Sequence, residues 1–346
     1  MQRFTCGTAE VGAADAARAG GKAAALGELA RAGLPVPRGF VITAGAFLLH
    51  MDEADPGGAA RGALGSLAPD DLDGIADAAA GLRVRVAAQA LPTDVAAEVT
   101  SAYAALGADA VAVRSSATLE DSAEASFAGL QDTYLAVRGT DAVLDRVRAC
   151  WASLYNDESI AYRRRQGIGE DGLAMGVVVQ RMLNPRSAGV MFTRSPVTGD
   201  RSVVAIEGTW GLGSALVGGE VTPDSFMVSK VTGEITGRRV GVKLRVHSFT
   251  PNGQGISATP MAVPLRRTPC LTDDEVRTLA RLGRQVEDHY GAPQDIEWAL
   301  LGDSPGRFVL LQSRPETVWA ARDREPIASP QAKASDHVLA RFSRGL

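Results

Sequence analysis

Several short segments of the sequence carry residue types that suit phosphate and metal chemistry. In the first, Gly20 and Gly21 stand at the start of a predicted helix, and Lys22 follows them directly. A glycine pair at a helix start exposes backbone N–H groups, and a lysine beside them can neutralise a phosphate. The G-x-x-x-x-G-K-[ST] spacing of a P-loop is absent. An ordinary helix start with a solvated lysine is therefore the alternative interpretation.

Two further segments combine a cation, hydroxyl groups and a glycine turn. Arg114 comes at the end of a predicted strand and is followed by Ser115, Ser116 and Thr118. A guanidinium in this setting can bind polyphosphate oxygens through two hydrogen bonds, although a surface turn with hydroxyl caps has the same composition. The segment 126–133 places small residues at a hairpin tip, where backbone amides can approach phosphates closely. A plain tight turn is the alternative there.

A single amide side chain interrupts the apolar strand that we predict over residues 175–183. This residue is Gln180, and Arg181 and Met182 follow it. Ligand pockets commonly place a few polar groups in apolar walls, so this strand can read the edge of an adenine base. A core strand with an outward-facing glutamine explains the same pattern.

A carboxylate and an amide occur on two strands that we predict to form a hairpin, over 295–301 and 307–312. If the strands are antiparallel neighbours, Glu297 and Gln312 can face the same side, and Arg314 points the same way because strand side chains alternate. Carboxylate and amide oxygens are hard ligands that suit Mg²⁺. A surface ladder of polar residues is the alternative. Taken together, the segments contain the parts of a magnesium-nucleotide phosphotransferase.

Composition limits the class of protein. The chain has 346 residues, of which 45% are hydrophobic and 22% charged, as expected of a globular protein with one large domain or two joined subdomains. The net charge of −4 and the aromatic content of 5% argue against nucleic acid as a partner. Three scattered cysteines fit no disulfide framework. We find no signal peptide or membrane-spanning run, and expect a cytoplasmic protein without membrane partners.

The predicted elements alternate between helices and paired strands. Helical spacing predicts helices over 21–33, 70–105, 141–165 and 272–290, the last capped by Thr272. Strands are predicted over 39–43, 110–116, 175–183 and 187–196, the last two as partners, with a strand, turn and helix start over 202–219. Hairpins are predicted over 226–246 and 295–312, and loose connections over 52–66 and 250–269. This mixture favours an α+β fold with two lobes.

Five ordered stretches identify a resemblance. They are GGKAAALGELARAGLPVPRGFVIT, AVRSSATLEDSAEASFAGLQDTYL, VVVQRMLNPRSAGVMFTRSPVTGD, EGTWGLGSALVGGEVTPDSF and DIEWALLGDSPGRFVLLQSRPET. Over roughly residues 15–320 the chain resembles the N-terminal nucleotide-binding domain of phosphoenolpyruvate synthase and pyruvate, phosphate dikinase, shared with rifampicin phosphotransferase. The resemblance implies an ATP-grasp fold with ATP between an N-terminal lobe (1–190) and a C-terminal lobe (191–320), followed by a tail or linker stub (321–346).

The resemblance also implies a role for each candidate residue, with ATP and Mg²⁺ as the ligands. In this interpretation the phosphate-binding cations are Lys22, Arg114 and Arg314, the loop over the phosphates contains Gly129 and Thr133, the adenine side contains Gln180 and Met182, and the Mg²⁺ ligands are Glu297 and Gln312. One departure is Ser214, because members of the family often have glutamate after the Gly-Leu-Gly of 211–213. The local role of 211–214 is therefore open.

The family reaction passes through a histidine on a further domain. None of the four histidines, His50, His247, His289 and His337, has the surrounding sequence of such a phosphocarrier. We therefore expect an ATP-dependent phosphotransferase subunit that passes the β-phosphate of ATP to a histidine on a separate partner chain, with AMP and phosphate formed. The final acceptor would be a small molecule, namely a phenol, an alcohol or pyruvate. The alternatives are a self-sufficient kinase or ligase, a non-catalytic nucleotide-binding protein, and a fragment of a longer protein.

Overall fold

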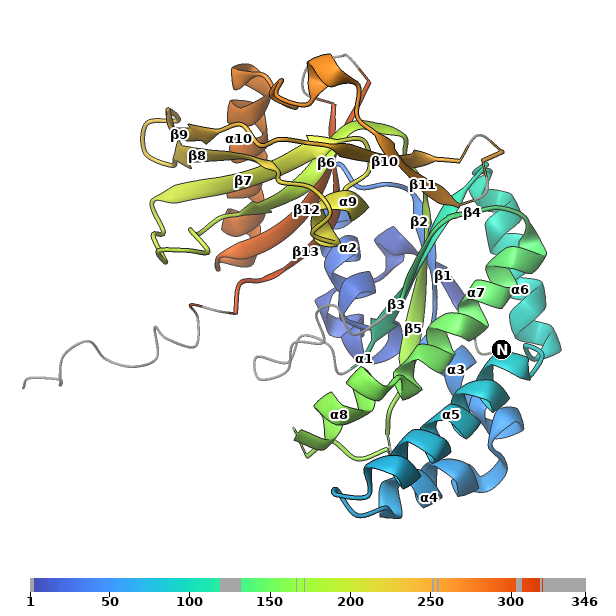
Figure 1. The fold of residues 1–346 in the computed structure, drawn as a ribbon. Coiled ribbons are helices and arrows are strands. Elements are labelled where there is room, and N and C mark those ends of the chain that lie inside the picture. The colour runs from blue at the N-terminus through green and yellow to red at the C-terminus, as the bar shows by residue number, and fades with distance from the viewer. Residues whose placement is uncertain are drawn as a thin grey trace, which may run out of the picture.

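The computed structural model describes residues 3–118, 132–165, 167–170, 172–250, 252–253, 255–302, 307–317 and 319. Two antiparallel sheets organise these residues into two lobes (Figure 1). We call residues 3–181 the N-terminal lobe and residues 185–315 the C-terminal lobe. Along the chain, the last strand of the first sheet ends at Arg181, and the first strand of the second sheet begins at Pro185. The chain thus changes sheets a few residues before the expected lobe boundary at 190.

The N-terminal lobe is a five-stranded sheet with helices on both faces. Its strand order is β1 (Thr5–Gly7), β2 (Gly39–Ile42), β5 (Met175–Arg181), β3 (Val111–Ala117) and β4 (Thr133–Val137). The helices are α1 (Ala16–Ala19), α2 (Gly21–Arg31), α3 (Ala44–Ala54), α4 (Ala59–Ser66), α5 (Leu72–Ala88), α6 (Thr93–Leu106), α7 (Thr140–Ala152) and α8 (Asp157–Arg165). Single-turn helices lie at Thr8–Glu10, Ala13–Asp15, Pro56–Gly58 and Ser153–Tyr155.

Alternation along β5 shows how one strand supports both layers. Val177 and Val179 belong to the large core beneath α3, α5, α6 and α7, whereas Val178 packs with Leu26 of α2 on the opposite face. This is the period-two pattern of a strand buried on both sides. Leu29, one turn further along α2, packs into the core of the C-terminal lobe. Helix α2 therefore joins the two lobes.

The C-terminal lobe is a six-stranded sheet backed by one long helix. Its strand order is β13 (Phe308–Pro315), β12 (Gln294–Leu301), β6 (Pro185–Phe192), β7 (Val203–Trp210), β8 (Asp224–Ser229) and β9 (Ile235–Arg239). Helix α10 (Asp273–Tyr290) is capped as expected, because Thr272 accepts a hydrogen bond from the Glu275 N–H. The remaining elements are α9 (Ser214–Val217), the hairpin β10 (Arg245–Phe249) and β11 (Ile256–Pro260), and a single turn at Val263–Leu265.

Four local predictions are wrong. The helix predicted over 141–165 is broken at Asn156, whose extended backbone separates α7 from α8. Residues 52–66 are mainly helical, and 250–269 contain β11. Strand β6 does not pair with β5, because β5 lies between β2 and β3 while β6 lies between β12 and β7. The apolar pattern showed two strands in succession, but it carried no information on which sheet each one enters.

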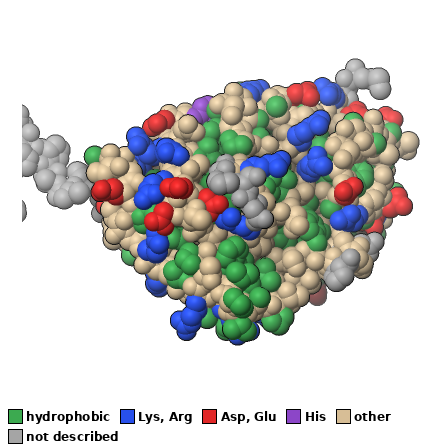
Figure 2. Space-filling model, turned by 90° about the horizontal axis from the view of Figure 1, so that it is seen from above, with side chains coloured by type: hydrophobic (Ala, Val, Ile, Leu, Met, Phe, Trp, Pro, Cys, Tyr) green, Lys and Arg blue, Asp and Glu red, His purple; other side chains and the backbone are tan. Residues whose placement is uncertain are grey.

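Charged side chains of both signs occur on the described surface. On the face shown in Figure 2, Lys and Arg side chains are interspersed with Asp and Glu side chains. Within the described ranges, no helix is both long and apolar enough to cross a membrane.

Candidate functional site

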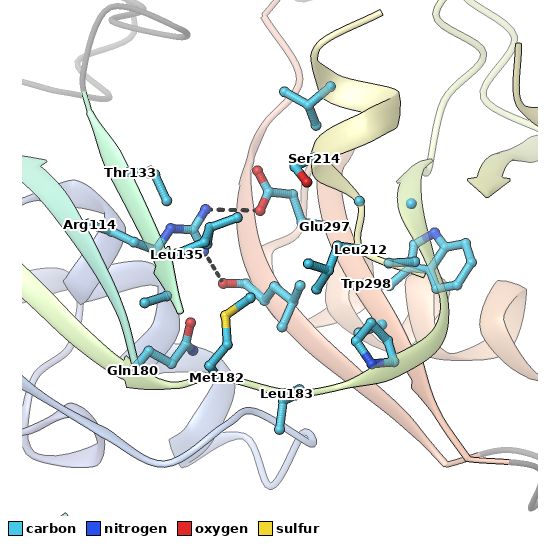
Figure 3. A pocket seen from close by; sticks show the side chains of 18 of the residues that line it. Arg114, Thr133, Leu135, Gln180, Met182, Leu183, Leu212, Ser214, Glu297 and Trp298 are labelled. Carbon is cyan, nitrogen blue, oxygen red and sulfur yellow. Dashed lines mark hydrogen bonds and ion pairs between the residues drawn. The ribbon is translucent and has the colours of Figure 1, made fainter. Parts of the chain in front are cut away.

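A cavity of about 280 Å³ lies between the two lobes and is lined by both sheets (Figure 3). We call it the interlobe pocket. The N-terminal lobe contributes residues of β3, β4 and β5, and the C-terminal lobe contributes residues of β6, β12, β13 and the segment after β7. Among the lining residues are Arg114, Thr133, Gln180, Met182 and Glu297. Five of the nine residues proposed from the sequence thus line this one cavity.

Arg114 crosses from one lobe to the other. Its Nη2 donates to Glu297 Oε2 at 2.9 Å and to Gln312 Oε1 at 2.6 Å, and its Nη1 donates to the Leu311 carbonyl at 3.1 Å. The arginine is buried, and its Nε has no hydrogen-bond partner among the described residues. A buried guanidinium is stabilised only when it is paired and hydrogen-bonded. Among the described residues, the partners of Arg114 all lie in the opposite lobe.

Glu297 and Gln312 are directly opposite each other on neighbouring strands, as the hairpin pattern predicts. Both side-chain oxygens contact the same nitrogen of Arg114, so they converge on one positively charged point. A carboxylate oxygen and an amide oxygen in this arrangement fit a small hard cation such as Mg²⁺. The described residues contain no group of three or more His, Cys, Asp or Glu side chains placed to hold a metal ion. This is compatible with Mg²⁺, which is commonly held by one or two carboxylates together with substrate phosphates.

Lys22 and Arg314 lie beside this centre and outside the pocket lining. Lys22 Nζ donates to the Ser115 carbonyl at 3.2 Å, next to Arg114 in β3. Arg314 donates from Nε and Nη2 to Asp295 Oδ2 at 2.8 and 2.6 Å. Burial raises the pKa of the Asp295 carboxyl, and the adjacent Arg314 opposes that shift. Asp295 is not among the candidate residues predicted from the sequence, although its position opposite Arg314 follows from the same hairpin register.

Gln180 and Met182 lie at another part of the pocket, with Leu183 beside them (Figure 3). Gln180 is only 3% exposed, and its Nε2 has no hydrogen-bond partner within the described part of the chain. An unpaired buried amide donor is costly, so a ligand acceptor at this position would be stabilising. The backbone N–H of Met182 already donates to the Ala110 carbonyl at 2.9 Å. The backbone N–H of Met182 is therefore already paired, and the residue lines the pocket with its side chain.

The loop expected over the phosphates is only partly described. Thr133, the first residue of β4, lines the interlobe pocket. Gly129 lies outside the described residues, so its proposed role stays a prediction.

A second polar group at the pocket was not predicted. Ser214, whose role was left open, contacts His247, which in turn contacts Glu220. No spacing signal relates positions 214, 220 and 247, because they meet only through the packing of β10 against the segment after β7.

With this geometry established, comparison with known proteins identifies the family. Residues 16–335 match the model of the pyruvate phosphate dikinase AMP/ATP-binding domain. The chain belongs to this family. Its two-lobed α+β fold confirms the expected ATP-grasp type.

Similar curated proteins share the family. The chain is 47% identical over 89% of its length to a rifampicin phosphotransferase of a Streptomyces species. It is 38% identical over 99% of its length to a probable phosphoenolpyruvate synthase of Staphylothermus marinus, and 38% identical over 90% to a phosphoenolpyruvate synthase of Aeropyrum pernix. The matched regions cover 35%, 44% and 42% of those three proteins, respectively. The chain therefore corresponds to less than half the length of each relative.

Proposed function

We propose that this chain is the Mg-ATP-binding part of a dikinase-type phosphotransferase. It would pass the β-phosphate of ATP to a histidine on a separate partner chain, leaving AMP and phosphate, and a small molecule such as a phenol, an alcohol or pyruvate would be the final acceptor. Membership in an AMP/ATP-binding family and similarity to proteins named as phosphotransferases and synthases support this assignment.

One observation carries the proposal: the contact of Arg114 with Glu297 and Gln312 across the pocket. This contact pairs a cation of one lobe with oxygen ligands of the other. A ligand that enters between them must offer anionic groups to the arginine and a cation to the oxygens. A magnesium-bound polyphosphate offers both, and uncharged or purely anionic ligands do not.

The chemical roles follow from this arrangement. Arg114 and the nearby Lys22 would bind phosphate oxygens, with the fork of Arg114 fixing their orientation. Glu297 and Gln312 would hold Mg²⁺, which when bound supplies charge stabilisation to the transferring phosphoryl group. The unpaired amide of Gln180 would donate a hydrogen bond to the adenine base, and the base would lie among apolar side chains such as Met182 and Leu183. Phosphoryl transfer depends mainly on such positioning and charge stabilisation.

Product analysis tests the proposal. The isolated chain is incubated with ATP and Mg²⁺, and the phosphorus products are followed by ³¹P NMR. We expect ATP binding with slow turnover, and faster formation of AMP when a protein bearing a phosphohistidine domain is added. Formation of ADP, or full-rate phosphorylation of a small molecule by the isolated chain, would instead indicate a direct kinase.

A further inference from the structure

Three side chains form a hydrogen-bonded series that ends at the interlobe pocket. Ser214 Oγ lies 2.9 Å from His247 Nδ1, and His247 Nε2 lies 3.2 Å from Glu220 Oε2. Ser214 lines the pocket, the His247 side chain is 8% exposed, and Glu220 is at the surface. The half-buried Ser214 hydroxyl is thus hydrogen-bonded to a buried imidazole, which is in turn hydrogen-bonded to an exposed carboxylate.

For a neutral His247, the chemistry of these groups gives the direction of both hydrogen bonds. An ionised carboxylate can only accept, so the ring nitrogen Nε2 of His247 carries a proton and donates to Glu220. In the neutral imidazole, Nδ1 is then an acceptor, and the Ser214 hydroxyl donates to it. The lone pairs of Ser214 Oγ remain for the pocket. Ser214 therefore presents a hydrogen-bond acceptor to a ligand.

The segment that carries Ser214 is also held by the backbone of His247. The Leu212 N–H donates to the His247 carbonyl at 2.9 Å. Gly211 has a φ of +72°, and a Cβ at this residue would lie 2.5 Å from the same carbonyl oxygen, so only glycine permits this approach. His247 thus fixes both the path of the segment and the orientation of the Ser214 hydroxyl.

The hairpin that carries His247 reaches the other lobe. Near its tip, the Gly255 N–H donates to the Ala136 carbonyl at 3.2 Å, and Arg138 donates to the Gly253 carbonyl. Ala136 belongs to β4, the strand that brings Thr133 to the pocket. Figure 1 shows β10 and β11 extending from the C-terminal lobe to β4. The position of Ser214 is therefore set relative to both lobes.

ATP offers few donors to such an acceptor. Phosphate oxygens only accept, so the donors on ATP are the base amine and the two sugar hydroxyls. Gln180 and Met182, the proposed base-binding residues, lie at a different part of the pocket from Ser214 (Figure 3). We propose that Ser214, oriented by His247 and Glu220, accepts a hydrogen bond from a sugar hydroxyl of the bound nucleotide and so favours nucleotides that carry this hydroxyl over the deoxynucleotide that lacks it. This inference rests on the proposed binding of ATP.

A thermodynamic cycle tests this role. The Kd values of ATP, 2′-deoxy-ATP and 3′-deoxy-ATP are measured by calorimetry for the wild type and for Ser214→Ala. We expect Ser214→Ala to weaken ATP about 2- to 10-fold, the range of one neutral hydrogen bond. It should leave unchanged the affinity for the deoxynucleotide that lacks the contacted hydroxyl. Equal losses for all three nucleotides, or no loss for ATP, would overturn the inference.

Further variants separate orientation from general damage. Glu220→Ala alters the exposed end of the series and should cause a smaller loss, confined to nucleotides that carry the contacted hydroxyl. An equal loss for every nucleotide would contradict the orienting role. Ser257→Ala, on β11 of the same hairpin, is the matched control and should bind all three nucleotides like the wild type. A wild type that binds none of them refutes the proposed function itself, whereas one that binds all three equally refutes only this inference.

Discussion

The two walls of the interlobe pocket differ in the kind of polar atom they present. The N-terminal wall offers donors, since Arg114 and Gln180 line the pocket and each retains a buried nitrogen without a described partner. The C-terminal wall offers acceptors, namely the side-chain oxygens of Glu297 and Gln312, and that of Ser214. The hydrogen bonds of Arg114 to Glu297 and Gln312 pair a donor of one wall with acceptors of the other.

This difference indicates what a ligand must replace. A ligand that separates Arg114 from Glu297 has to neutralise a guanidinium on one side and a carboxylate on the other. Leaving the buried charge of Arg114 unpaired costs several kcal/mol, and an anion alone would leave the partly exposed Glu297 without a cation. The comparison therefore predicts that nucleotide and metal bind more tightly together than separately.

The largest effect should come from removing the charge of the acceptor wall. Glu297→Gln keeps the shape of the side chain and an acceptor for Arg114, but it removes the anionic ligand proposed for Mg²⁺. We expect Mg²⁺-dependent ATP turnover to fall by about 10²-fold or more, because metal charge stabilisation is worth several kcal/mol. Turnover is measured as AMP release with the histidine-bearing partner present.

A control shows whether the loss reflects the metal site. Asp274→Asn removes a carboxylate that is 92% exposed on α10 of the same lobe, and it should leave turnover unchanged. The melting temperature of Glu297→Gln should remain within a few degrees of the wild-type value. Wild-type turnover in Glu297→Gln would refute the assignment of Glu297 as a metal ligand.

The next effect should come from removing the cation of the donor wall. Arg114→Gln should weaken ATP by about 10- to 150-fold, since hydrogen bonds to charged groups contribute about 1.5–3 kcal/mol. Adenosine, which has no phosphate, should lose much less affinity. Both affinities are measured by calorimetry, with Arg165→Gln at the exposed end of α8 as the control. Equal losses for ATP and adenosine would show that Arg114 supports the pocket without binding phosphate.

A smaller effect is expected at the base. Gln180→Leu removes a buried donor that has no described partner, so it should leave the free protein as stable as before or more stable. ATP should nevertheless bind about 2- to 10-fold more weakly, because one hydrogen bond to the base is lost. Gln180→Glu, which keeps the volume and replaces the donor with an acceptor, is the matched comparison. Unchanged ATP affinity in both variants would exclude Gln180 from base recognition.

The sequence predicts the local parts of this site better than their assembly. The register of β12 and β13 follows from alternation and a short turn, so the pairing of Glu297 with Gln312 could be predicted. The contact of Arg114 with that pair joins residues 183 positions apart. Only the packing of the two lobes creates it, and the resemblance to a family supplied the expectation of a shared site. Neither the local sequence pattern nor the family resemblance predicted the contact of Ser214 with His247, because this contact depends on where the hairpin of β10 and β11 packs.

Behind the pocket wall, both lobes bury an ion pair, Arg163 with Glu170 in the N-terminal lobe and Asp224 with Lys243 in the C-terminal lobe. The core of the N-terminal lobe also buries His50, which packs on Trp151 and contacts the Val86 carbonyl. Burial lowers the pKa of His50, and Arg148 adds to this shift, while the contact with Val86 and the charge of Glu53 oppose it.

This histidine should make folding stability fall in mild acid. Because the folded-state pKa of His50 lies below its unfolded value of about 6.5, the unfolded chain binds more protons as pH falls through 6.5, and folding stability is lost in that direction. His50→Gln can keep a donor for the Val86 carbonyl without titrating. The wild type should lose up to about 1.4 kcal/mol per pH unit more than His50→Gln between pH 6.5 and 5.5. Urea unfolding at pH 6.5 and 5.5 measures this difference in the free energy of unfolding. His289→Gln, at the surface, is the control. If the wild type and His50→Gln lose the same stability, His50 does not set the acid sensitivity.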